Sequence, residues 1–287
     1  MENRIYNRIA VLLLFTISLL FCLPARTQYL KYPIVGTYKG KTAQGMAING
    51  NYAYLMSSGG LCRKYDLATK KVVKEFLLAS AGPKNHVNSA CFGVADKFTG
   101  GMPLLYISEC NGICRCFVED ISGNKPQLLQ TISSRAKGHP QGVVSWVVDK
   151  KGKNIYAVIR GNKPVDDIGN VKNTIVKYRL PELSEGAEVC LTEKDELDRF
   201  DVQFANIIQG CKIENQYLYV SSGLQESVSE RKDAKRAVII IDLKKRMLKK
   251  IVDLTYVTTN EPEDIDKYDG KWLMYCGQEG GLYQIKL

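Results

Sequence analysis

Short segments that alternate apolar and polar residues recur along the chain, with glycine, asparagine or charged residues between them. Such alternation, bounded by turn residues, predicts β-strands in an antiparallel meander. One group of four segments covers residues 44–76 and turns at Gly59 and Gly60. A second group with the same order of segments covers residues 209–254. The repeat indicates an all-β protein that is built from four-stranded units.

Three further units are less regular. One covers residues 88–132, and the next begins at residue 141, with its fourth strand expected at Glu188–Leu191. The last unit begins at residue 263 and supplies only three strands. The five units start at residues 44, 88, 141, 209 and 263, and most of these spacings are near the roughly 40–50 residues of a propeller blade.

The incomplete last unit suggests how the chain closes. A ring of four-stranded sheets leaves no open edge only when its last sheet is complete. Residues 33–38, with the sequence PIVGTY, could supply the missing strand. We therefore predict a single-domain, five-bladed β-propeller of four-stranded antiparallel blades over residues 28–287, with the last blade closed by the N-terminal strand.

Residues 1–27 are expected to be a signal peptide. Arg4 and Arg8 precede an uncharged apolar stretch over residues 9–23, and a Pro-Ala-Arg sequence follows, which is the layout of a secretory signal. The stretch is shorter than the roughly 20 residues of a membrane span. A retained anchor is one alternative, and a lipoprotein linked through Cys22 is another, which the bulky Phe21 disfavours. We expect a secreted or periplasmic monomer with no transmembrane segment after cleavage.

The composition is that of a globular protein, with 45% hydrophobic and 24% charged residues. Removing residues 1–27 subtracts three Arg and one Glu, so the formal charge falls from +10 to +8, and it leaves eight of the nine cysteines. Export permits disulfides, so the eight are expected as disulfides or as buried thiols such as Cys91 and Cys211. The cysteine cluster over residues 110–116 lacks the C-x2-C pairs of common zinc sites.

The openings of the units and the ends of their third strands resemble a known family. The openings are Gln44-Gly45, Gln141-Gly142, Gln209-Gly210 and Pro262-Glu263. The third strands end in Asp66-Leu67, Asp120-Ile121 and Asp242-Leu243. This pattern resembles secreted five-bladed β-propeller proteins, in particular exported propellers of Bacteroidetes-type bacteria. The resemblance implies that the blade connections gather on one face, around the mouth of a central channel.

The residues that open the units are expected to face one another at this channel mouth, where they are candidate ligand-binding residues: Gln44, Asn88, Gln141, Gln209 and Glu263. Loops on a rigid scaffold commonly carry binding residues. The alternative is structural, because amides also satisfy backbone groups and water where blades converge. Gln at three of five equivalent positions suits that alternative.

Two histidines and a glutamate break the repeat. His86 and His139, the only histidines, each lie two residues before an opening position, and Glu261 has the same place before Glu263. Imidazole can act as a base near neutral pH, so His86, His139 and Glu263 are the catalytic candidates. Glu261, Glu263 and Asp264 are the metal-binding candidates, and their oxygens suit calcium. The alternatives are that the histidines cap turns and that the acidic residues are solvated.

Three longer segments are expected on the same face. The connection between the third and fourth units is acidic over residues 193–201, and insertions occupy residues 161–173 and 223–236. Such insertions commonly form lids or partner-binding surfaces. Solvated loops are the alternative for each.

Several catalytic signatures are absent from the sequence, among them the Gly-x-Ser-x-Gly elbow, the phosphate-binding Gly-x-x-x-x-Gly-Lys loop and His-Glu-x-x-His. Their absence argues against nucleotide-dependent and α/β-hydrolase chemistry. The basic pairs fall in turns of different units, whereas a nucleic-acid surface gathers them on one face. No nucleic-acid partner is therefore expected.

We predict that the protein binds a ligand or a protein partner, such as a glycan or a peptide, through the channel-mouth face. The alternative is a calcium- or metal-assisted hydrolase, lactonase or lyase at the same face. A purely structural scaffold is a third hypothesis. The fold alone does not decide among them, because propellers carry both binding and catalytic functions.

Overall fold

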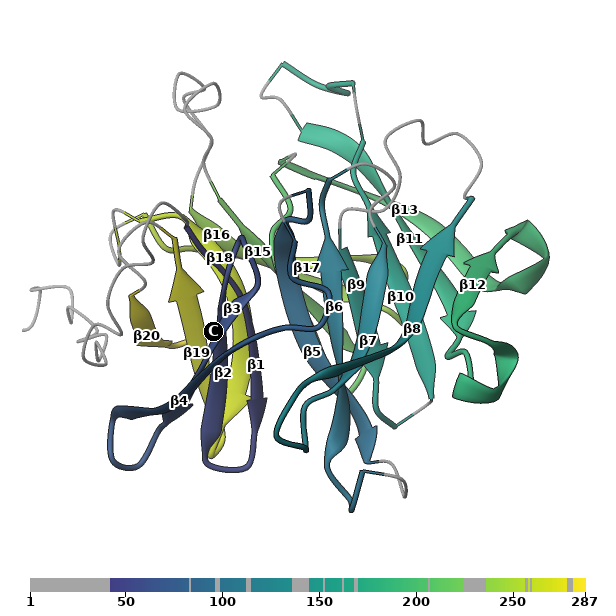
Figure 1. The fold of residues 1–287 in the computed structure, drawn as a ribbon. Helices are drawn as coiled ribbons and strands as arrows, with labels where there is room; N and C mark the ends of the chain where they lie inside the picture. Colours follow the sequence, from purple (N-terminus) through teal and green to yellow (C-terminus); the bar gives the residue numbers. More distant parts are fainter. Residues whose placement is uncertain are drawn as a thin grey trace, which may run out of the picture. The chain divides into compact units, whose positions relative to one another are not determined.

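The structure is a computed structural model that describes residues 42–82, 84–95, 99–111, 115–135, 145–151, 153–161, 163–167, 170–205, 207–223, 236–255, 258, 260–277 and 281–287. All of these residues belong to one compact unit. They contain strands β1 to β20 and two 3-10 helices, η1 (Leu183–Glu185) and η2 (Glu193–Asp195) (Figure 1). Within them, no helix is both long and apolar enough to cross a membrane. The predicted all-β class is confirmed.

The strands form five sheets, each of which is one blade. Blade one contains β1 (Ala43–Asn49), β2 (Tyr52–Ser57), β3 (Leu61–Asp66) and β4 (Lys71–Leu77). Blade two contains β5 (Val87–Ala95), β6 (Pro103–Glu109), β7 (Cys116–Asp120) and β8 (Gln127–Ser134). Blade three contains β9 (Ser145–Asp149), β10 (Asn154–Ile159), β11 (Asn170–Arg179) and β13 (Glu196–Ala205). Blade four contains β14 (Cys211–Glu214), β15 (Tyr217–Ser222), β16 (Ala237–Asp242) and β17 (Met247–Asp253). Blade five contains β18 (Pro262–Tyr268), β19 (Lys271–Cys276) and β20 (Leu282–Ile285).

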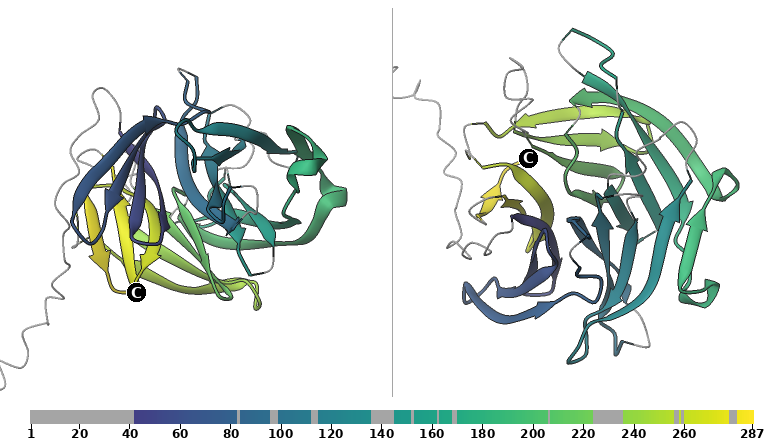
Figure 2. Two further views of the ribbon diagram at one scale, coloured as in Figure 1. Left: turned by 60° about the horizontal axis from the view of Figure 1, so that its bottom comes forward. Right: turned by 45° about the horizontal axis from the view of Figure 1, so that its top comes forward.

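The first strands of the five blades line the centre of a ring. Strand β1 packs against β5, β5 against β9, β9 against β14, β14 against β18, and β18 against β1 (Figure 2). Strand β5 also packs against β14 and β18 across the centre, so side chains there lie close together. The predicted five-bladed propeller is confirmed. Residues 33–38, predicted to complete blade five, lie outside the described residues.

Blade three differs from the sequence prediction in its outer strand. The predicted fourth strand is β12 (Glu188–Leu191), which pairs in parallel with β8 at the edge of blade two. The outer strand of blade three is β13, which pairs with β11 from Asn170↔Ala205 to Tyr178↔Glu196. Both β11 and β13 have ten residues, whereas β12 has four. The alternating pattern marked a strand correctly, but an alternating pattern does not specify the partner of a strand.

The acidic segment over residues 193–201 consequently lies on η2 and β13 rather than in a loop between blades. Three of its carboxylates form ion pairs with basic side chains: Arg199–Glu196, Lys172–Asp201 and Arg246–Asp198. Charged side chains on an edge strand discourage pairing with another chain. Of the two predicted insertions, residues 170–173 belong to β11, and residues 224–235 lie outside the described residues.

Gln130 in β8 anchors the segment that leads to β12. Its buried amide nitrogen Nε2 donates to the carbonyl oxygens of Glu182 and Gly186, each at 2.9 Å. These contacts lie at the start of the segment that crosses from blade three to blade two. Because two carbonyls depend on one side chain, the docking of β12 depends on Gln130.

We expect Gln130→Met to loosen β12 while the five blades stay folded. The change keeps the length of the side chain but leaves two carbonyls without their donor, at a cost of about 1–3 kcal/mol. Hydrogen–deuterium exchange of the amides in Glu188–Leu191 should become faster. Gln127→Met, at an exposed position of the same strand, is the control, and equal exchange in the two variants would contradict the anchoring role.

The aspartates that end the third strands cap the turns that follow them. Asp66 Oδ1 accepts hydrogen bonds from the N–H groups of Ala68 at 2.8 Å and Thr69 at 3.0 Å. Asp242 Oδ1 accepts from Lys244 and Lys245 at 3.0 and 2.9 Å. The Asp-Leu motif therefore specifies the turn between the third and fourth strands, since an aspartate can bond to backbone N–H groups two residues on.

Five of the described cysteines are free thiols, namely Cys62, Cys91, Cys116, Cys190 and Cys211. Cys91, Cys116 and Cys211 are buried in the hydrophobic core of blades two, three and four, which also contains Trp146. Burial raises the pKa of Cys91 to about 11, so its thiol stays protonated and unreactive at neutral pH. For these positions the structure matches the buried-thiol alternative.

Candidate functional site

Strand β18 brings an acidic sequence to the centre of the ring. Asp264 is fully buried, and its Oδ2 accepts hydrogen bonds from the N–H groups of Met46 in β1 at 2.8 Å and Ala90 in β5 at 2.9 Å. Its Oδ1 accepts from Ile265 N–H at 2.8 Å. Burial raises the pKa of Asp264, and these three donors oppose the rise. The Asp264 carboxyl group therefore ties blade five to blades one and two.

Asp266 extends this connection, because residues two apart on a strand face the same side. Its Oδ2 accepts a hydrogen bond from Ile48 N–H at 2.7 Å, and its Oδ1 forms an ion pair with Lys212 of β14. Burial lowers the pKa of Lys212 and Asp266 raises it, with a net upward shift. Asp266 thus joins blade five to blades one and four, and both aspartates have structural roles.

Gly210 leaves room for Asp264 at the centre. A Cβ atom at residue 210 would lie 1.8 Å from Asp264 Oδ1 and 2.7 Å from its Cα. Such distances are far below van der Waals contact, so only glycine fits here. The Gln-Gly step that opens blade four therefore has a packing reason, namely close approach of its backbone to the central carboxyl group.

Glu263 has a different environment from its neighbours. The side chain is 2% exposed, and its Oε2 has no hydrogen-bond partner among the described residues. Burial raises the pKa of Glu263 well above its usual range, and the nearby Glu261 and Asp264 carboxyl groups raise it further. Both effects favour the protonated form of the carboxyl group. A buried carboxyl group without a partner costs folding free energy, which makes it a candidate functional group.

Glu261 and Gln209 lie beside Glu263, at the start of β18 and β14. The Gln209 amide nitrogen Nε2 donates to Glu261 Oε1 at 2.9 Å, and both side chains are half-buried. Burial raises the pKa of Glu261, whereas Gln209 and Arg236 lower it. A Cβ atom on Gly223 would lie 2.3 Å from Glu261 Oε1. Glu261 is thus held between blades four and five.

The structure brings together several of the residues that the sequence predicted for the channel mouth. Asn88 Nδ2 donates to the carbonyl oxygen of Gln209 at 3.5 Å, which connects blade two to blade four. Gln44 Nε2 donates to Thr42 Oγ1 at 3.3 Å, within its own blade. His139 and Gln141 lie outside the described residues. The described cluster therefore consists of Asn88, Gln209, Glu261 and Glu263.

The three metal-binding candidates have separate environments. Asp264 faces β1 and β5, whereas Glu261 pairs with Gln209 and Glu263 lies against Gly277, where a Cβ atom would be 2.2 Å from its Oε1. Over the residues that the structure describes, no three His, Cys, Asp or Glu side chains form a group that could hold a metal ion. The pairing of β18 with β19 shifts register between Pro262 and Asp264, so Glu263 lies at an irregular position of the strand.

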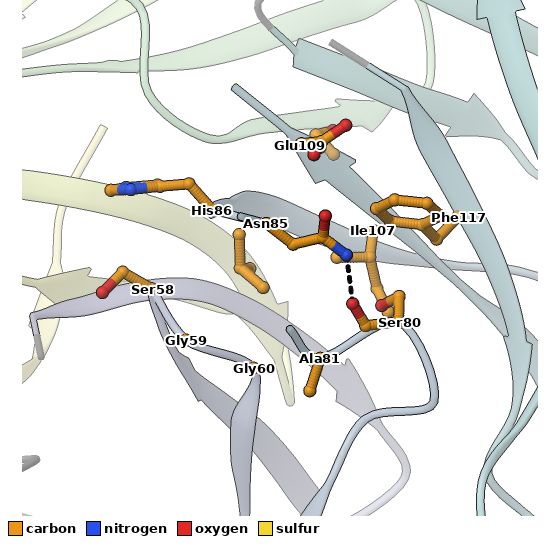
Figure 3. Close-up of a pocket in the computed structure, with 12 residues that line it drawn as sticks. Ser58, Gly59, Gly60, Ser80, Ala81, Asn85, His86, Ile107, Glu109 and Phe117 are labelled. Carbon is orange, nitrogen blue, oxygen red and sulfur yellow. Dashed lines mark hydrogen bonds between the residues drawn. The ribbon is translucent and has the colours of Figure 1, made fainter. Parts of the chain in front are cut away.

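His86 lies at a small cavity between blades one and two, with a volume of about 10 Å³, which is room for about one water molecule. Ser58 and Ser80 line it from blade one and its connection, and Glu109 lines it from blade two. Figure 3 shows the His86 ring extending away from Glu109. Both oxygens of Glu109 already accept hydrogen bonds from Arg115, at 2.8 and 3.1 Å.

Asp266, Lys212 and Ser221 were not among the site residues predicted from the sequence. Asp266 could have been found from the alternation in Glu263-Asp264-Ile265-Asp266, because the two aspartates share a face. No feature of the sequence marked Lys212, since a buried lysine in a strand cannot be distinguished from a solvent-exposed lysine by sequence alone. The side chain of Ser221 is fully buried, and its Oγ has no hydrogen-bond partner among the described residues, which only the structure shows.

Comparisons with known proteins identify the fold. No protein-family model and no curated protein sequence matches the chain. Among solved structures, 1147 chains match, so the fold is shared too widely to indicate one function. One of them is a glutaminyl cyclase of Myxococcus xanthus, which has 15% sequence identity and a TM-score of 0.50. The match covers 90% of this chain and 94% of that chain, and at this identity it shows the shared fold alone.

Proposed function

We propose that the protein is an exported propeller that binds a ligand or a protein partner at the channel-mouth end of blades two, four and five. The binding residues are Asn88, Gln209, Glu261 and Glu263. Glycans and peptides are the ligand classes that suit such groups, because amides and carboxyl groups bond to hydroxyl and amide groups. Export is inferred from the signal-like sequence of residues 1–27.

One observation carries this proposal: the unpartnered Oε2 of Glu263 in a side chain that is 2% exposed. Buried polar atoms in folded proteins nearly always have a partner, so this atom suggests a group supplied by a ligand. Gln209 and Glu261 lie half-buried beside it. The purely structural alternative explains Asp264 and Asp266 well but leaves Glu263 unexplained.

The protein, labelled with a fluorophore, can be tested on glycan and peptide arrays. We expect a defined class of array ligands to bind, and Glu263→Gln to weaken that binding at least about tenfold, because a charged partner or a carboxyl donor is lost. Glu214→Gln is the matched control, since Glu214 lies on β14 and pairs with Lys267 at 3.0 Å. Equal binding by wild type and Glu263→Gln would contradict the proposed site.

An enzyme at the same face is the second candidate, a hydrolase, lactonase or lyase. The observation in its favour is the buried Glu263 beside the half-buried Glu261, because two neighbouring carboxyl groups in different environments can serve as general acid and base. The Myxococcus xanthus glutaminyl cyclase, which is an enzyme by name, has a similar fold, so the fold is compatible with catalysis. Turnover of a lactone and ester panel that falls at least about a hundredfold in Glu263→Gln would favour this function over binding alone.

A further inference from the structure

The inner strands of the five blades run in the same direction. Asp264 of β18 accepts a hydrogen bond from Met46 N–H of β1, and two residues further along both strands Asp266 accepts one from Ile48 N–H. Similar steps separate the contacts between other inner strands: Gly210–Glu263 and Lys212–Asp266 for β14 with β18, and Ser89–Ser145 and Cys91–Val148 for β5 with β9. Each of the first four blades has four strands that alternate in direction, so the next blade begins at the same end as the last. All five inner strands therefore lead away from the channel mouth.

The turns at the far ends of these strands share one side of the ring, which we call the hairpin face. The chain turns back after the first and the third strand of a blade, so both kinds of turn lie opposite the channel mouth. The described turns of the hairpin face are residues 50–51, 67–70, 99–102, 121–126, 150–151, 153, 180–182, 215–216, 243–246 and 269–270. In Figure 1 the turns after β1 and β3 lie along the lower side of the view. Basic pairs that the sequence places in turns of different blades thus come to one side of the molecule.

Exposed basic side chains are concentrated on the hairpin face. They lie in or next to turns of every blade: Lys70, Lys71, Lys125, Lys150, Lys151, Lys153, Lys244, Lys245, Arg246 and Lys271. The aspartates that end strands at this side, such as Asp66 and Asp242, are half-buried or buried and accept backbone hydrogen bonds. Apart from Asp269, the exposed carboxylates described at this side belong to η1, η2 and the segment between them, at the outer edge of blade three. The rest of the hairpin face is therefore a basic surface.

Exposed apolar side chains lie beside the basic turns. Val72, Val94, Leu128 and Met247 are between 37% and 53% exposed, and each lies within two positions of the strand end at the hairpin face. Singly exposed apolar residues are common on protein surfaces, but these four share one end of the molecule with the basic turns. Their burial against a partner would remove apolar area from water, which is favourable.

Half-buried aromatic side chains complete this surface. Tyr52, Tyr217, Tyr268 and Trp272 lie at or next to strand ends of the hairpin face, and each is partly exposed. Lys64 Nζ lies 3.9 Å from the centre of the Tyr52 ring, which adds a cation beside one of them. Tyr and Trp are typical of the boundary between lipid and water, because their rings are apolar and their tips are polar.

We infer that the hairpin face docks on the surface of a bilayer that contains anionic phospholipids. Basic side chains are attracted to anionic headgroups, and each one near such a surface strengthens binding about fivefold. Apolar and aromatic side chains enter the boundary between headgroups and acyl chains. A soluble polyanion would bind the lysines but leave the exposed apolar side chains in water. The channel mouth then points away from the bilayer, so this inference is independent of ligand binding at Glu263.

Quenching of tryptophan fluorescence by brominated acyl chains tests the contact. The chain has two tryptophans, and Trp146 is 1% exposed, so quenching by lipid reports on Trp272. We expect vesicles of brominated phosphatidylcholine and phosphatidylglycerol in equal parts to quench Trp272 at about 0.1 M salt. Brominated phosphatidylcholine alone should quench it much less. A readout tied to one side chain is needed because residues 9–23, when retained, could bind lipid by themselves.

Two double variants of equal charge locate the contact. Lys244→Gln with Lys245→Gln should raise the lipid concentration at half-maximal quenching at least about tenfold. Lys84→Gln with Lys172→Gln is the control, because Lys84 lies in the connection from β4 to β5 and Lys172 near the channel-mouth end of β11. The control should change that concentration by less than about twofold, since salt screens charges that lie far from the bilayer. All four side chains are exposed, so both variants should keep the circular dichroism spectrum of wild type.

Replacing apolar side chains separates a bilayer from a soluble polyanion. Met247→Ser with Leu128→Ser keeps the charge, and it should raise the lipid concentration at half-maximal quenching at least about threefold, because less apolar area is buried. Unchanged quenching in this variant would contradict the inference. Tighter binding of wild type to heparin or to duplex DNA than to the anionic vesicles, at the same salt concentration, would assign the hairpin face to a soluble polyanion instead.

Two further outcomes would overturn the inference. Equal quenching by phosphatidylcholine alone would show that headgroup charge does not matter. Equal weakening by Lys244→Gln with Lys245→Gln and by the control variant would show that net charge, rather than the hairpin face, drives the contact. Glycan and peptide arrays contain no lipid, so array binding that depends on Glu263 stands or falls separately from each of these results.

Discussion

Replacing Asp264 with alanine is expected to destabilise the protein by about 2–6 kcal/mol. The change leaves the N–H groups of Met46 and Ala90 without their acceptor at the buried centre, and each such group costs about 1–3 kcal/mol. Because these donors belong to blades one and two, the loss weakens the contact that joins them to blade five. Marginally stable proteins unfold under a loss of this size.

Urea unfolding followed by tryptophan fluorescence measures the effect. Asp66→Ala is the matched control, because Asp66 also accepts two backbone hydrogen bonds, but within one exposed turn. We expect that change to cost about 1 kcal/mol or less. If Asp264→Ala and Asp66→Ala cost the same, then the central carboxyl group does not connect the blades. A soluble but unfolded Asp264→Ala protein, seen by circular dichroism, would agree with the expectation.

The architecture could be predicted from the sequence because each blade repeats the same local problem. Turn aspartates such as Asp66 and Asp242 recur where a third strand meets a fourth, and strand alternation marks the elements themselves. Such local signals need no information about distant residues. The prediction of the outer strand of blade three was wrong for the same reason. The pairing of Glu188–Leu191 with β8 depends on a long-range partner, which no local pattern specifies.

The candidate site was predicted only in part for a related reason. Glu261 and Glu263 stood out because they replace residues of the repeat, and the structure places both beside Gln209. No pattern in the sequence separates the roles of Asp264 and Glu263. Asp264 accepts hydrogen bonds from three backbone N–H groups, whereas Glu263 has an oxygen without a partner among the described residues. That distinction arises from the pleat of β18 and from the neighbouring strands, so only the packed ring reveals it.

Replacing Glu263 with glutamine is expected to stabilise the protein at neutral pH. The folded-state pKa of Glu263 is raised well above its usual value, so the folded protein retains a proton that the unfolded chain releases. A group of this kind contributes stability below its unfolded pKa and loses that contribution as the pH rises. The penalty grows by about 1.4 kcal/mol for each pH unit while the folded carboxyl group stays protonated. Glutamine resembles the protonated carboxyl group in shape and carries no such penalty.

Urea unfolding of wild type and Glu263→Gln at pH 5.5, 6.5 and 7.5 checks this expectation. The difference in unfolding free energy should increase in favour of the variant as the pH rises, by at most about 1.4 kcal/mol for each pH unit. For Glu214→Gln it should stay constant, because Glu214 is partly exposed and paired with Lys267. A constant difference for Glu263→Gln would mean that Glu263 is ionised in the folded protein. That result would require a buried cation beside it, since an ionised and unpaired carboxylate is too costly to bury.

The direction of this effect bears on function. If glutamine is the more stable residue at neutral pH, then packing and stability do not explain a glutamate at position 263. Residues that cost stability are typical of sites where a ligand or a reaction supplies the compensating interaction.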